Sequence, residues 1–585
     1  MKHWKNVLFV LVLAAMLLSA CQPAATQVVE PTKAPAEPTK AAEPTKAAEP
    51  TKAPEPTKAP EGPVPGGKVI IGTPQEPGTL SPLLASASIE DAISSFVIEG
   101  LVQVDADGKY APVLAEALPT VSDDSLTVTY KLKQGVKFSD GSDFNCKDVV
   151  FTKDAILSDK SGASTSGYSK IDKIECPDDY TVVVTFSDVY APYLRLFSYI
   201  IPDNAGDLAN LDTWDFNRNP IGTGPWVLKE WKAGESMTFA KNPNYREPGK
   251  PYLDQLIVKI VPSREVGLQE LGTGEVNVLW DLVEADFPAI AALKDKGVSY
   301  AAAQTGENEL LVLNLADPKV DGPADPAANP HPILFDVNVR KAFQLAINKQ
   351  EIVDGLLSGQ VKVGTTVLPV GQFACAQPEV AFDLEGAKKL LEDAGWKAGS
   401  DGIRAKNGAR LSLKIATTSG NQLREQTEQV LVEQLKQAGI ELVIENVPSD
   451  VLFAGWSSNG MRKHGAFDIL LYTTGPGIDP DSHLFSNYHS ASIPTAANEG
   501  SGSNYSRYIN ADVDANIDAA AGTTDVAKRQ ELYCKVATQI NADLPRIFLY
   551  ERLLISGYRT DLQNFKVSPG PSDFTVGSEN WYLKP

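Results

Sequence analysis

Pairs of neighbouring carboxylates are the residues in this sequence whose spacing could support acid–base chemistry. Asp123/Asp124, Asp178/Asp179 and Asp479/Asp481 each bring two acids within one or two residues of each other, and two carboxylates in different environments can act as general acid and general base. Such pairs arise readily by chance in a chain with 74 acidic residues. No G-x-S-x-G segment places a serine nucleophile on a sharp turn. We therefore predict that the chain is not an enzyme; a surface-tethered hydrolase is the alternative from that class.

Histidine and cysteine spacing does not indicate a metal site. The five histidines form no H-E-x-x-H motif and no tight cluster, and no C-x-x-C pair is present. Residues 512–518 carry acids or amides at alternating positions, as calcium loops do, but Ile517 stands where such a loop needs glycine and Thr523 where it needs the terminal acid. We interpret this segment as the start of a helix and expect no metal and no other cofactor.

The amino terminus has the pattern of a secretory signal. Lys2 and Lys5 precede an apolar run from Val7 to Leu18, which is too short to span a bilayer as a finished helix. The run ends in Leu18-Ser19-Ala20-Cys21, which is typical of a bacterial lipobox. Residues 1–20 are then a signal peptide, and Cys21 is the lipidated first residue of the mature chain; a plain signal peptide with an incidental cysteine is the alternative.

Residues 21–65 are predicted to be a disordered linker after the lipidated cysteine. The segment Glu-Pro-Thr-Lys-Ala recurs in it, starting at Glu30, Glu37, Glu43, Glu49 and Glu55. A proline-rich stretch without aromatic residues cannot bury enough surface to fold and favours extended polyproline II. We interpret it as a spacer. An adhesin, which this stalk alone suggests, would show no small-ligand cleft.

The charge of the chain belongs to the part after the linker. The whole chain of 585 residues carries a net charge of -21, and the residues after position 65 carry 46 basic and 68 acidic groups. This acidity argues against a nucleic-acid partner, because neutralising phosphates requires clustered lysine and arginine. Four cysteines in this part (Cys146, Cys176, Cys375 and Cys534) predict two disulfides outside the cytoplasm, with three possible pairings.

Hydrophobic periodicity predicts strands that alternate with helices from residue 66 onward. Asn145 is a predicted helix cap with Asp148 as the acid of a capping box, and a long amphipathic helix is expected over 421–438. Strands are expected at 68–72, 126–132, 180–186, 440–447 and 468–473, and further helical faces at 339–347 and 387–394. Alternation of this kind indicates α/β lobes with mixed sheets.

These segments, in their order along the chain, resemble the extracellular solute-binding proteins, family 5, which include the oligopeptide-, dipeptide- and nickel-binding proteins of ABC importers. The matching segments run from about residue 66 to residue 569. They are Ser139–Asp143 with Lys147–Phe151, Ile221–Trp231, Asn242–Tyr245, Lys250–Asp254, Gly274–Asn277, Asp336–Ala342 with Ala346–Asn348, and Gly500–Tyr508.

The resemblance implies a two-lobed periplasmic-binding-protein-like fold of the class II type, with mixed sheets and a two-strand hinge. The first lobe comprises residues 66–305 and 545–585 and contains an extra subdomain over 107–215; the second comprises 306–544. Strands 309–315 and 547–555 are the hinge candidates. Given these lobes, Cys146–Cys176 and Cys375–Cys534 are the preferred disulfides, since each pair then closes within one lobe.

The resemblance also implies ligand-binding residues. In peptide-binding relatives, a strand of the second lobe leads into a loop with an aromatic residue and an aspartate that grips the amino group; here that stretch makes Tyr472, Thr473, Thr474 and Asp479 the expected contacts. Pro476 stands where those relatives place the aspartate. Either Asp479 takes over, or the ligand lacks a free amine.

Further expected ligand contacts come from both lobes. Arg424 is the candidate for a peptide carboxylate, although Glu425 competes for the same register and an ordinary solvated residue in a first helical turn is the alternative. Glu76 and Thr79 lie in a loop that faces the cleft in the relatives. Trp280 is a candidate for stacking on the ligand, with a place in the core as the alternative.

We therefore predict a monomeric, lipid-anchored, extracytoplasmic receptor of an ABC importer. Its location is the outer face of the cytoplasmic membrane, in the periplasm or at the cell surface, with lipid as its only membrane anchor. Its partners are a peptide and the permease subunits. A non-peptide solute, such as an oligosaccharide or chelated nickel, is the alternative within this class.

Overall fold

The computed structural model describes residues 62–584. The predicted signal peptide, the lipidated Cys21 and nearly all of the linker lie outside these residues. The described helices are α2 (Ser88–Ser94), α3 (Cys146–Leu157), α4 (Arg264–Thr273), α5 (Phe287–Ala291), α6 (Val337–Ala346), α7 (Lys349–Leu356), α8 (Leu384–Asp393), α9 (Gln422–Gln437), α10 (Ser449–Leu452), α11 (Met461–His464), α12 (Asp481–Tyr488), α13 (Ala511–Ala521) and α14 (Val526–Asp543).

The strands alternate with these helices along much of the chain. They are β1 (Lys68–Thr73), β2 (Val102–Val104), β3 (Tyr110–Pro112), β4 (Thr120–Val121), β5 (Thr127–Lys131), β6 (Ile171–Asp178), β7 (Thr181–Phe186), β8 (Trp226–Lys232), β9 (Ser236–Lys241), β10 (Gln255–Ile260), β11 (Val278–Leu282), β12 (Val298–Leu313), β13 (Lys397–Ala398), β14 (Arg404–Lys406), β15 (Ala409–Arg410), β16 (Ser412–Ala416), β17 (Glu441–Ile444), β18 (Ile469–Thr474), β19 (Arg546–Arg559), β20 (Leu562–Gln563) and β21 (Tyr582–Leu583). The predicted α/β class is confirmed.

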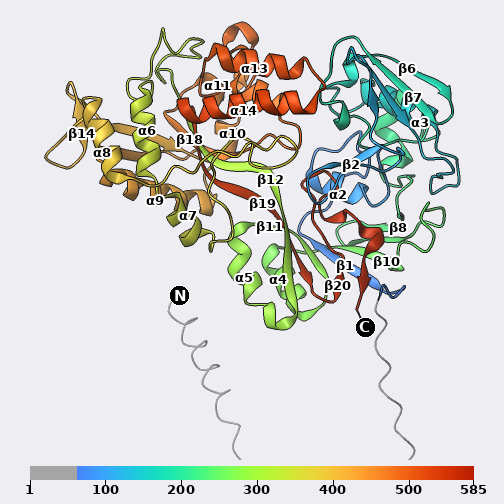
Figure 1. Cartoon of the computed structure of the whole chain (residues 1–585). Coiled ribbons are helices and arrows are strands. Elements are labelled where there is room, and N and C mark those ends of the chain that lie inside the picture. The colour runs from blue at the N-terminus through green and yellow to red at the C-terminus, as the bar shows by residue number, and fades with distance from the viewer. Residues whose placement is uncertain (1–61, 585) are drawn as a thin grey trace, which may run out of the picture. The chain divides into compact units, whose positions relative to one another are not determined.

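Ten strands form one large mixed sheet in the order β17-β16-β18-β12-β19-β11-β1-β10-β9-β8. The two longest, β12 and β19, pair antiparallel from Val298 opposite Arg559 to Val312 opposite Arg546. β18 pairs with the other edge of β12, and β11 with the other edge of β19. The two long strands thus join the elements on either side of them (Figure 1). The predicted strands near residues 309–315 and 547–555 are confirmed, while the division into lobes stays a prediction.

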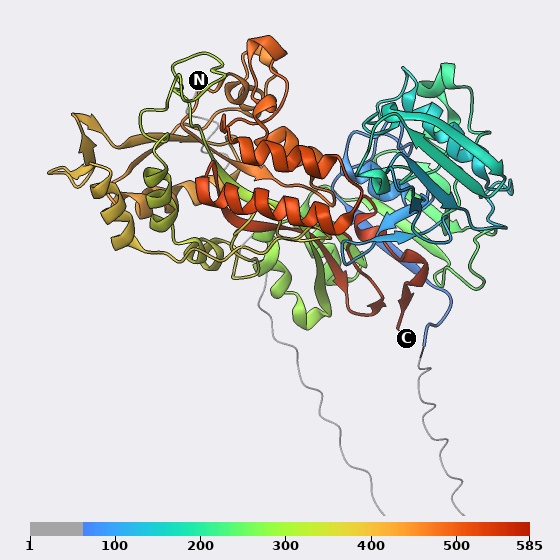
Figure 2. The same ribbon diagram turned by 45° about the horizontal axis from the view of Figure 1, so that its top comes forward.

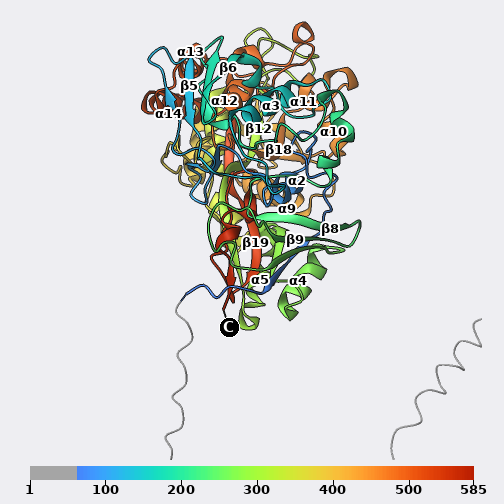
Figure 3. The same cartoon turned by 90° about the vertical axis from the view of Figure 1, so that its right-hand side faces the viewer.

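A separate four-stranded antiparallel sheet, β4-β5-β7-β6, lies within the segment predicted as the extra subdomain. Its strands lie away from β8 and β9, the edge of the large sheet, as Figures 1 and 3 agree. Asn145 caps α3 by accepting from the Lys147 amide, and Asp148 accepts from the Asn145 amide, so the predicted capping box is confirmed. A disulfide between Cys146 and Cys176 ties α3 to β6.

Hydrophobic side chains gather in three clusters among the described residues. One takes buried residues from 69–303 and 562–581, a second forms under α6–α9, and a third lies between β18 and α12–α14. The helices α13 and α14, the orange pair at the front of Figure 2, pack side by side. The second disulfide joins Cys375 to Cys534 of α14, so both preferred pairings are present.

The strands predicted from periodicity differ from the structure by at most one residue at their ends, except for one larger difference. The strand expected over 440–447 ends at Ile444, because the side chain of Asn446 turns back to accept from the Thr417 amide. The strand expected at 468–473 begins at Ile469 and runs to Thr474; Asp468 instead accepts from the Lys414 amide. The segment 512–518 is helical, within α13, as predicted.

Candidate functional site

A loop that follows β18 lies against β12 at the middle of the large sheet. Thr474, the last residue of β18, pairs with Asn308 of β12. A Cβ on the next residue, Gly475, would come within 2.4 Å of the Glu307 Cα, so only glycine fits this approach. The loop continues through Pro476 and Gly477, which both lie close to Gly306. The backbone therefore holds this loop firmly against the long strands.

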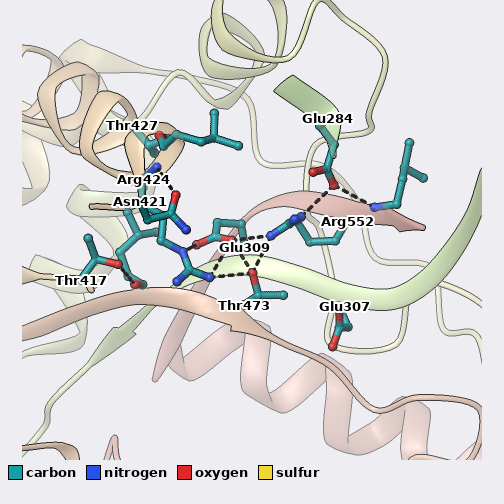
Figure 4. Close-up of polar contacts among 12 residues, drawn as sticks. Glu284, Glu307, Glu309, Thr417, Asn421, Arg424, Thr427, Thr473 and Arg552 are labelled. Atoms are coloured by element: carbon teal, nitrogen blue, oxygen red, sulfur yellow. Dashed lines mark hydrogen bonds and ion pairs between the residues drawn. The ribbon is translucent and has the colours of Figure 1, made fainter. Parts of the chain in front are cut away.

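Beside this loop, side chains from five segments of the chain form a group that we call the central ion network: Glu284, Glu309, Arg424, Thr473 and Arg552 (Figure 4). Glu309 of β12 and Thr473 of β18 are directly opposite in the register. Arg424 extends from the first turn of α9, whose cap Asn421 accepts from the Arg424 amide. Arg552 lies on β19, and Glu284 follows β11. The paired strands thus bring together residues separated by up to 268 positions.

In the central ion network, the two arginines donate hydrogen bonds to the two glutamates and to the Thr473 hydroxyl. Arg424 donates from Nε to Glu309 at 2.6 Å and from Nη2 to the Thr473 hydroxyl at 3.0 Å. Arg552 donates from Nη1 to the same hydroxyl at 2.8 Å and to Glu309 at 3.2 Å, and from Nε to Glu284 at 2.7 Å. The Glu284 and Glu309 side chains are 0% and 1% exposed. Two carboxylates and two guanidinium groups therefore neutralise each other.

This arrangement bears on two predicted ligand contacts. The Thr473 hydroxyl and the Nε and Nη2 groups of Arg424 are engaged with each other and with Glu309 in this structure. Their role as ligand contacts stays a prediction, and it would require exchange of an internal partner. Glu307 lies near the network without a drawn bond to it (Figure 4), and burial raises the pKa of its carboxyl.

Asp479 also has an internal partner. Arg529 of α14 donates from both terminal nitrogens to its two carboxylate oxygens, at 2.9 and 2.8 Å, and both side chains are almost fully buried. Arg529 also donates to the Tyr533 hydroxyl. Tyr472 is buried in the third hydrophobic cluster, and Thr474 is half-buried at the end of β18. The predicted binding of a ligand amine by Asp479 stays a prediction. In this structure Arg529 already compensates the charge of Asp479.

The predicted contacts of the first lobe make bonds within the protein too. Glu76 accepts from the Trp231 indole and from the Gly234 amide. Thr79 is buried and donates to the Asn217 carbonyl. Trp280 is 4% exposed and its indole donates to Asp573 at 2.5 Å. For Trp280 the structure gives the core position that the sequence left open.

A well-formed cavity lies elsewhere, with a volume of about 450 Å³. Its walls come from residues 95–113, 194–198, 245–247 and 569–579, together with Pro476–Ile478. The volume falls within the roughly 300–1,000 Å³ of small-molecule sites. The cavity is thus bounded by the predicted first lobe on most sides and by the loop after β18 on another.

Ionisable groups line this cavity at two places. Lys133, Glu99, Arg246, Glu247 and Glu579 form one charge cluster. Arg246 pairs with Glu99 at 2.5 Å, and Glu247 is bound by a lysine outside the cavity at 2.8 Å. Burial lowers the pKa of Lys133, and the nearby Arg246 charge acts in the same direction, while the Glu99 and Glu247 charges oppose the shift. Burial raises the pKa of Glu579, which Glu99 and Glu247 raise further.

The second place lies toward the loop after β18. Arg195 and Tyr110 line the cavity here. Burial raises the pKa of Tyr110, and the Asp479 charge raises it further while the Arg195 charge opposes this. Among the described residues, Arg195 donates one long bond of 3.4 Å, to the Ser482 hydroxyl.

Pro476, which the sequence places where peptide-binding relatives have an aspartate, lines this cavity, whereas none of the predicted ligand contacts does. Arg195 within the run Pro192–Phe197 gives no signal of its own, because an exposed arginine between apolar residues is ordinary. Lys133 directly follows the strand predicted over 126–132, a position that does not by itself indicate a ligand contact. The cavity itself depends on contacts among segments more than 400 residues apart, which a local pattern does not reveal.

Within residues 62–584, no group of three or more histidine, cysteine, aspartate or glutamate side chains has the geometry to hold a metal ion. The same part of the chain contains no helix of sufficient length and apolarity to cross a membrane.

Comparisons with known proteins agree with this architecture. The family described as bacterial extracellular solute-binding proteins, family 5 Middle, matches residues 109–494. Protein XP55 of Streptomyces lividans is 31% identical over 82% of this chain and 83% of its own, and the oligopeptide-binding protein AppA of Bacillus subtilis is 28% identical over 89% and 92%. The solved structure of AppA in complex with a nonapeptide matches 89% of this chain and all of its own, with a TM-score of 0.63 and 26% identity.

Proposed function

Because the chain belongs to the bacterial extracellular solute-binding proteins of family 5, and is thus the substrate-binding protein of an ABC importer, we propose that it captures peptides between two lobes and delivers them to a membrane permease. The observation that carries this proposal is the cavity of about 450 Å³ between the predicted first lobe and the loop after β18. A ligand enclosed there contacts both sides, so binding stabilises their closed arrangement.

The contacts that cross from the predicted extra subdomain to the predicted second lobe support opening of this cleft. Arg529 donates to the Ala191 carbonyl and Arg195 to the Ser482 hydroxyl, each at 3.4 Å, and the Ser125 and Thr524 hydroxyls meet at 2.8 Å. The two bonds of 3.4 Å are long and weak, and the hydroxyl pair is an uncharged contact that water can replace. A bound ligand that contacts both sides would then favour the closed arrangement.

Peptides are the proposed cargo because AppA is named as an oligopeptide-binding protein and its solved complex holds a nonapeptide. The test is the thermal unfolding of the full-length chain, purified in mild detergent, with peptides of two to nine residues, oligosaccharides and nickel chelates. A ligand that binds only the folded chain raises the melting temperature with its concentration. No shift with peptides of any length, together with a shift for a sugar or a nickel chelate, would replace the peptide with that solute.

We further propose that a lipid on Cys21 anchors the protein to the outer face of the membrane. The lipobox pattern ending at Cys21 supports this. The test compares the wild type with Cys21→Ser in the source or a related bacterium, followed by membrane fractionation and labelling with a radioactive fatty acid. We expect the label and the membrane fraction to be lost together in the variant. Retention at the membrane without label would contradict the anchor.

A further inference from the structure

The cavity contains two cations for which the described residues supply no carboxylate partner. Lys133 and Arg195 both line it, and neither forms an ion pair with a side chain of residues 62–584, whereas Arg246 on the same wall pairs with Glu99 at 2.5 Å. Lys133 is half-buried, whereas Arg195 is exposed. For Lys133, partial removal from water without a partner costs solvation free energy that an anion beside it would restore; Arg195 is open to an anion that enters the cavity.

The acids nearest to these two cations are already engaged. Asp479, whose charge reaches Tyr110 beside Arg195, is held at both oxygens by Arg529. Glu99 is bound by Arg246, and Glu247 by Lys250 at 2.8 Å. The remaining wall acid, Glu579, is pushed toward its protonated form by burial and by Glu99 and Glu247, which raise its pKa. Glu99 and Glu247 still act on Lys133 through their charge, but within residues 62–584 no carboxylate forms an ion pair with Lys133 or Arg195, since each of these acids has another partner or is driven toward protonation.

The part of the loop that lines the cavity carries no charge. Pro476, Gly477 and Ile478 present no ionisable side chain at this wall, and the next residue, Asp479, is held by Arg529. A positively charged ligand group would find no unpaired acid on this loop and would face Arg195 nearby. A negatively charged group would find the arginine fork, which matches a carboxylate geometrically, and a second donor in the phenol of Tyr110.

We propose that the cavity selects an acidic solute, whose carboxylate groups pair with Arg195 at the loop side and with Lys133 at the opposite charge cluster. This rests on the proposed function and names its substrate class: peptides with acidic side chains. The chain after residue 65 is strongly acidic. Charges further away than about 8 Å are screened at physiological salt, so the selection of an anion must come from these local cations.

The experiment measures binding of tripeptide probes to the full-length chain in mild detergent by isothermal titration calorimetry. The probes are Glu-Glu-Glu, its neutral counterpart Gln-Gln-Gln, Lys-Lys-Lys, glutarate and inorganic phosphate. We expect Glu-Glu-Glu to bind at least tenfold more tightly than Gln-Gln-Gln, equivalent to 1.4 kcal/mol. The double variant Arg195→Gln/Lys133→Gln should lose this preference. Lys160→Gln, which removes an exposed lysine outside the cavity, should keep it.

The outcomes distinguish the proposed peptide function from the proposed preference for acidic ligands. Equal binding of the glutamate, glutamine and lysine peptides would overturn the acidic preference while leaving a peptide receptor. Binding of glutarate with no binding of any peptide would retain the carboxylate pairing and overturn the peptide function. Binding of phosphate alone would overturn the carboxylate assignment, and so would a double variant that folds normally and keeps the preference for Glu-Glu-Glu.

Discussion

The central ion network and the cavity contain similar charged groups but use them in opposite ways. In the network, Glu284 and Glu309 are completely buried and two arginines neutralise them through five charge-assisted bonds to acid and hydroxyl oxygens. In the cavity, Arg195 and Lys133 have no acidic partner among the described residues. A buried charge that is satisfied within the protein holds strands in place, whereas a cation left without a partner at a cavity wall is available to a ligand.

The largest expected effect comes from breaking the network at its centre. Glu309→Gln removes the carboxylate that Arg424 and Arg552 share, and leaves Arg424 buried without an acid. Removing one partner of a buried ion pair costs about 3–5 kcal/mol, to be measured as the free energy of unfolding in urea. The matched control is Glu445→Gln, since Glu445 is a half-exposed partner of Lys414 and its loss should have no measurable effect. A variant as stable as the wild type would show that the network contributes specificity rather than stability.

The second prediction tests whether Asp479 stabilises the fold, as the central ion network does, or contacts the ligand. Asp479→Asn removes the charge that Arg529 binds with both terminal nitrogens. We expect a loss of about 3 kcal/mol in unfolding free energy, because the arginine stays buried, and no change in the affinity for a bound peptide once folding is restored at low temperature. Loss of peptide affinity with unchanged stability would instead place Asp479 in the ligand site.

A third prediction concerns pH and the pair formed by Trp280 and Asp573, behind the cavity wall. Burial raises the pKa of Asp573 to about 7, against the hydrogen bond from the Trp280 indole. The stability that this carboxyl contributes is complete below its unfolded pKa near 4 and is lost as pH rises through about 7.

Asp573→Asn should therefore gain stability relative to the wild type by roughly 2–4 kcal/mol between pH 4 and pH 8. Urea unfolding of both proteins across this range measures the difference. A constant difference between the two proteins at every pH would contradict the raised pKa.

The smallest expected effect is in the cavity. Arg195→Gln and Lys133→Gln remove cations that no acid of the described chain neutralises, so each should change the unfolding free energy by less than about 0.5 kcal/mol. Differential scanning calorimetry without ligand measures this. A large loss of stability in either variant would show that the cation has an internal role and would remove the contrast between the two regions.

The structure confirms what local patterns predicted and adds what they could not. The capping box at Asn145 and the long helix expected over 421–438 are readable because each depends on neighbours within a few residues. The strands near 309–315 and 547–555 came from the family resemblance. The interactions of the predicted ligand contacts could not be predicted from local patterns. Arg424 was correctly placed in the first turn of α9, but its partner Glu309 lies 115 positions earlier, and only the pairing of β12 with β18 brings the two together.

The sequence by itself determined the class of fold, the helix starts, the acidic body and the family resemblance, because these follow from periodicity, caps and motifs along the chain. It also identified the two disulfides once lobes were assumed. The tertiary structure decided which charges are already paired and which face a cavity. Burial and ion pairing depend on distances between segments that are remote in sequence, so identical residue types such as Arg424 and Arg195 acquire different roles only when the chain is folded.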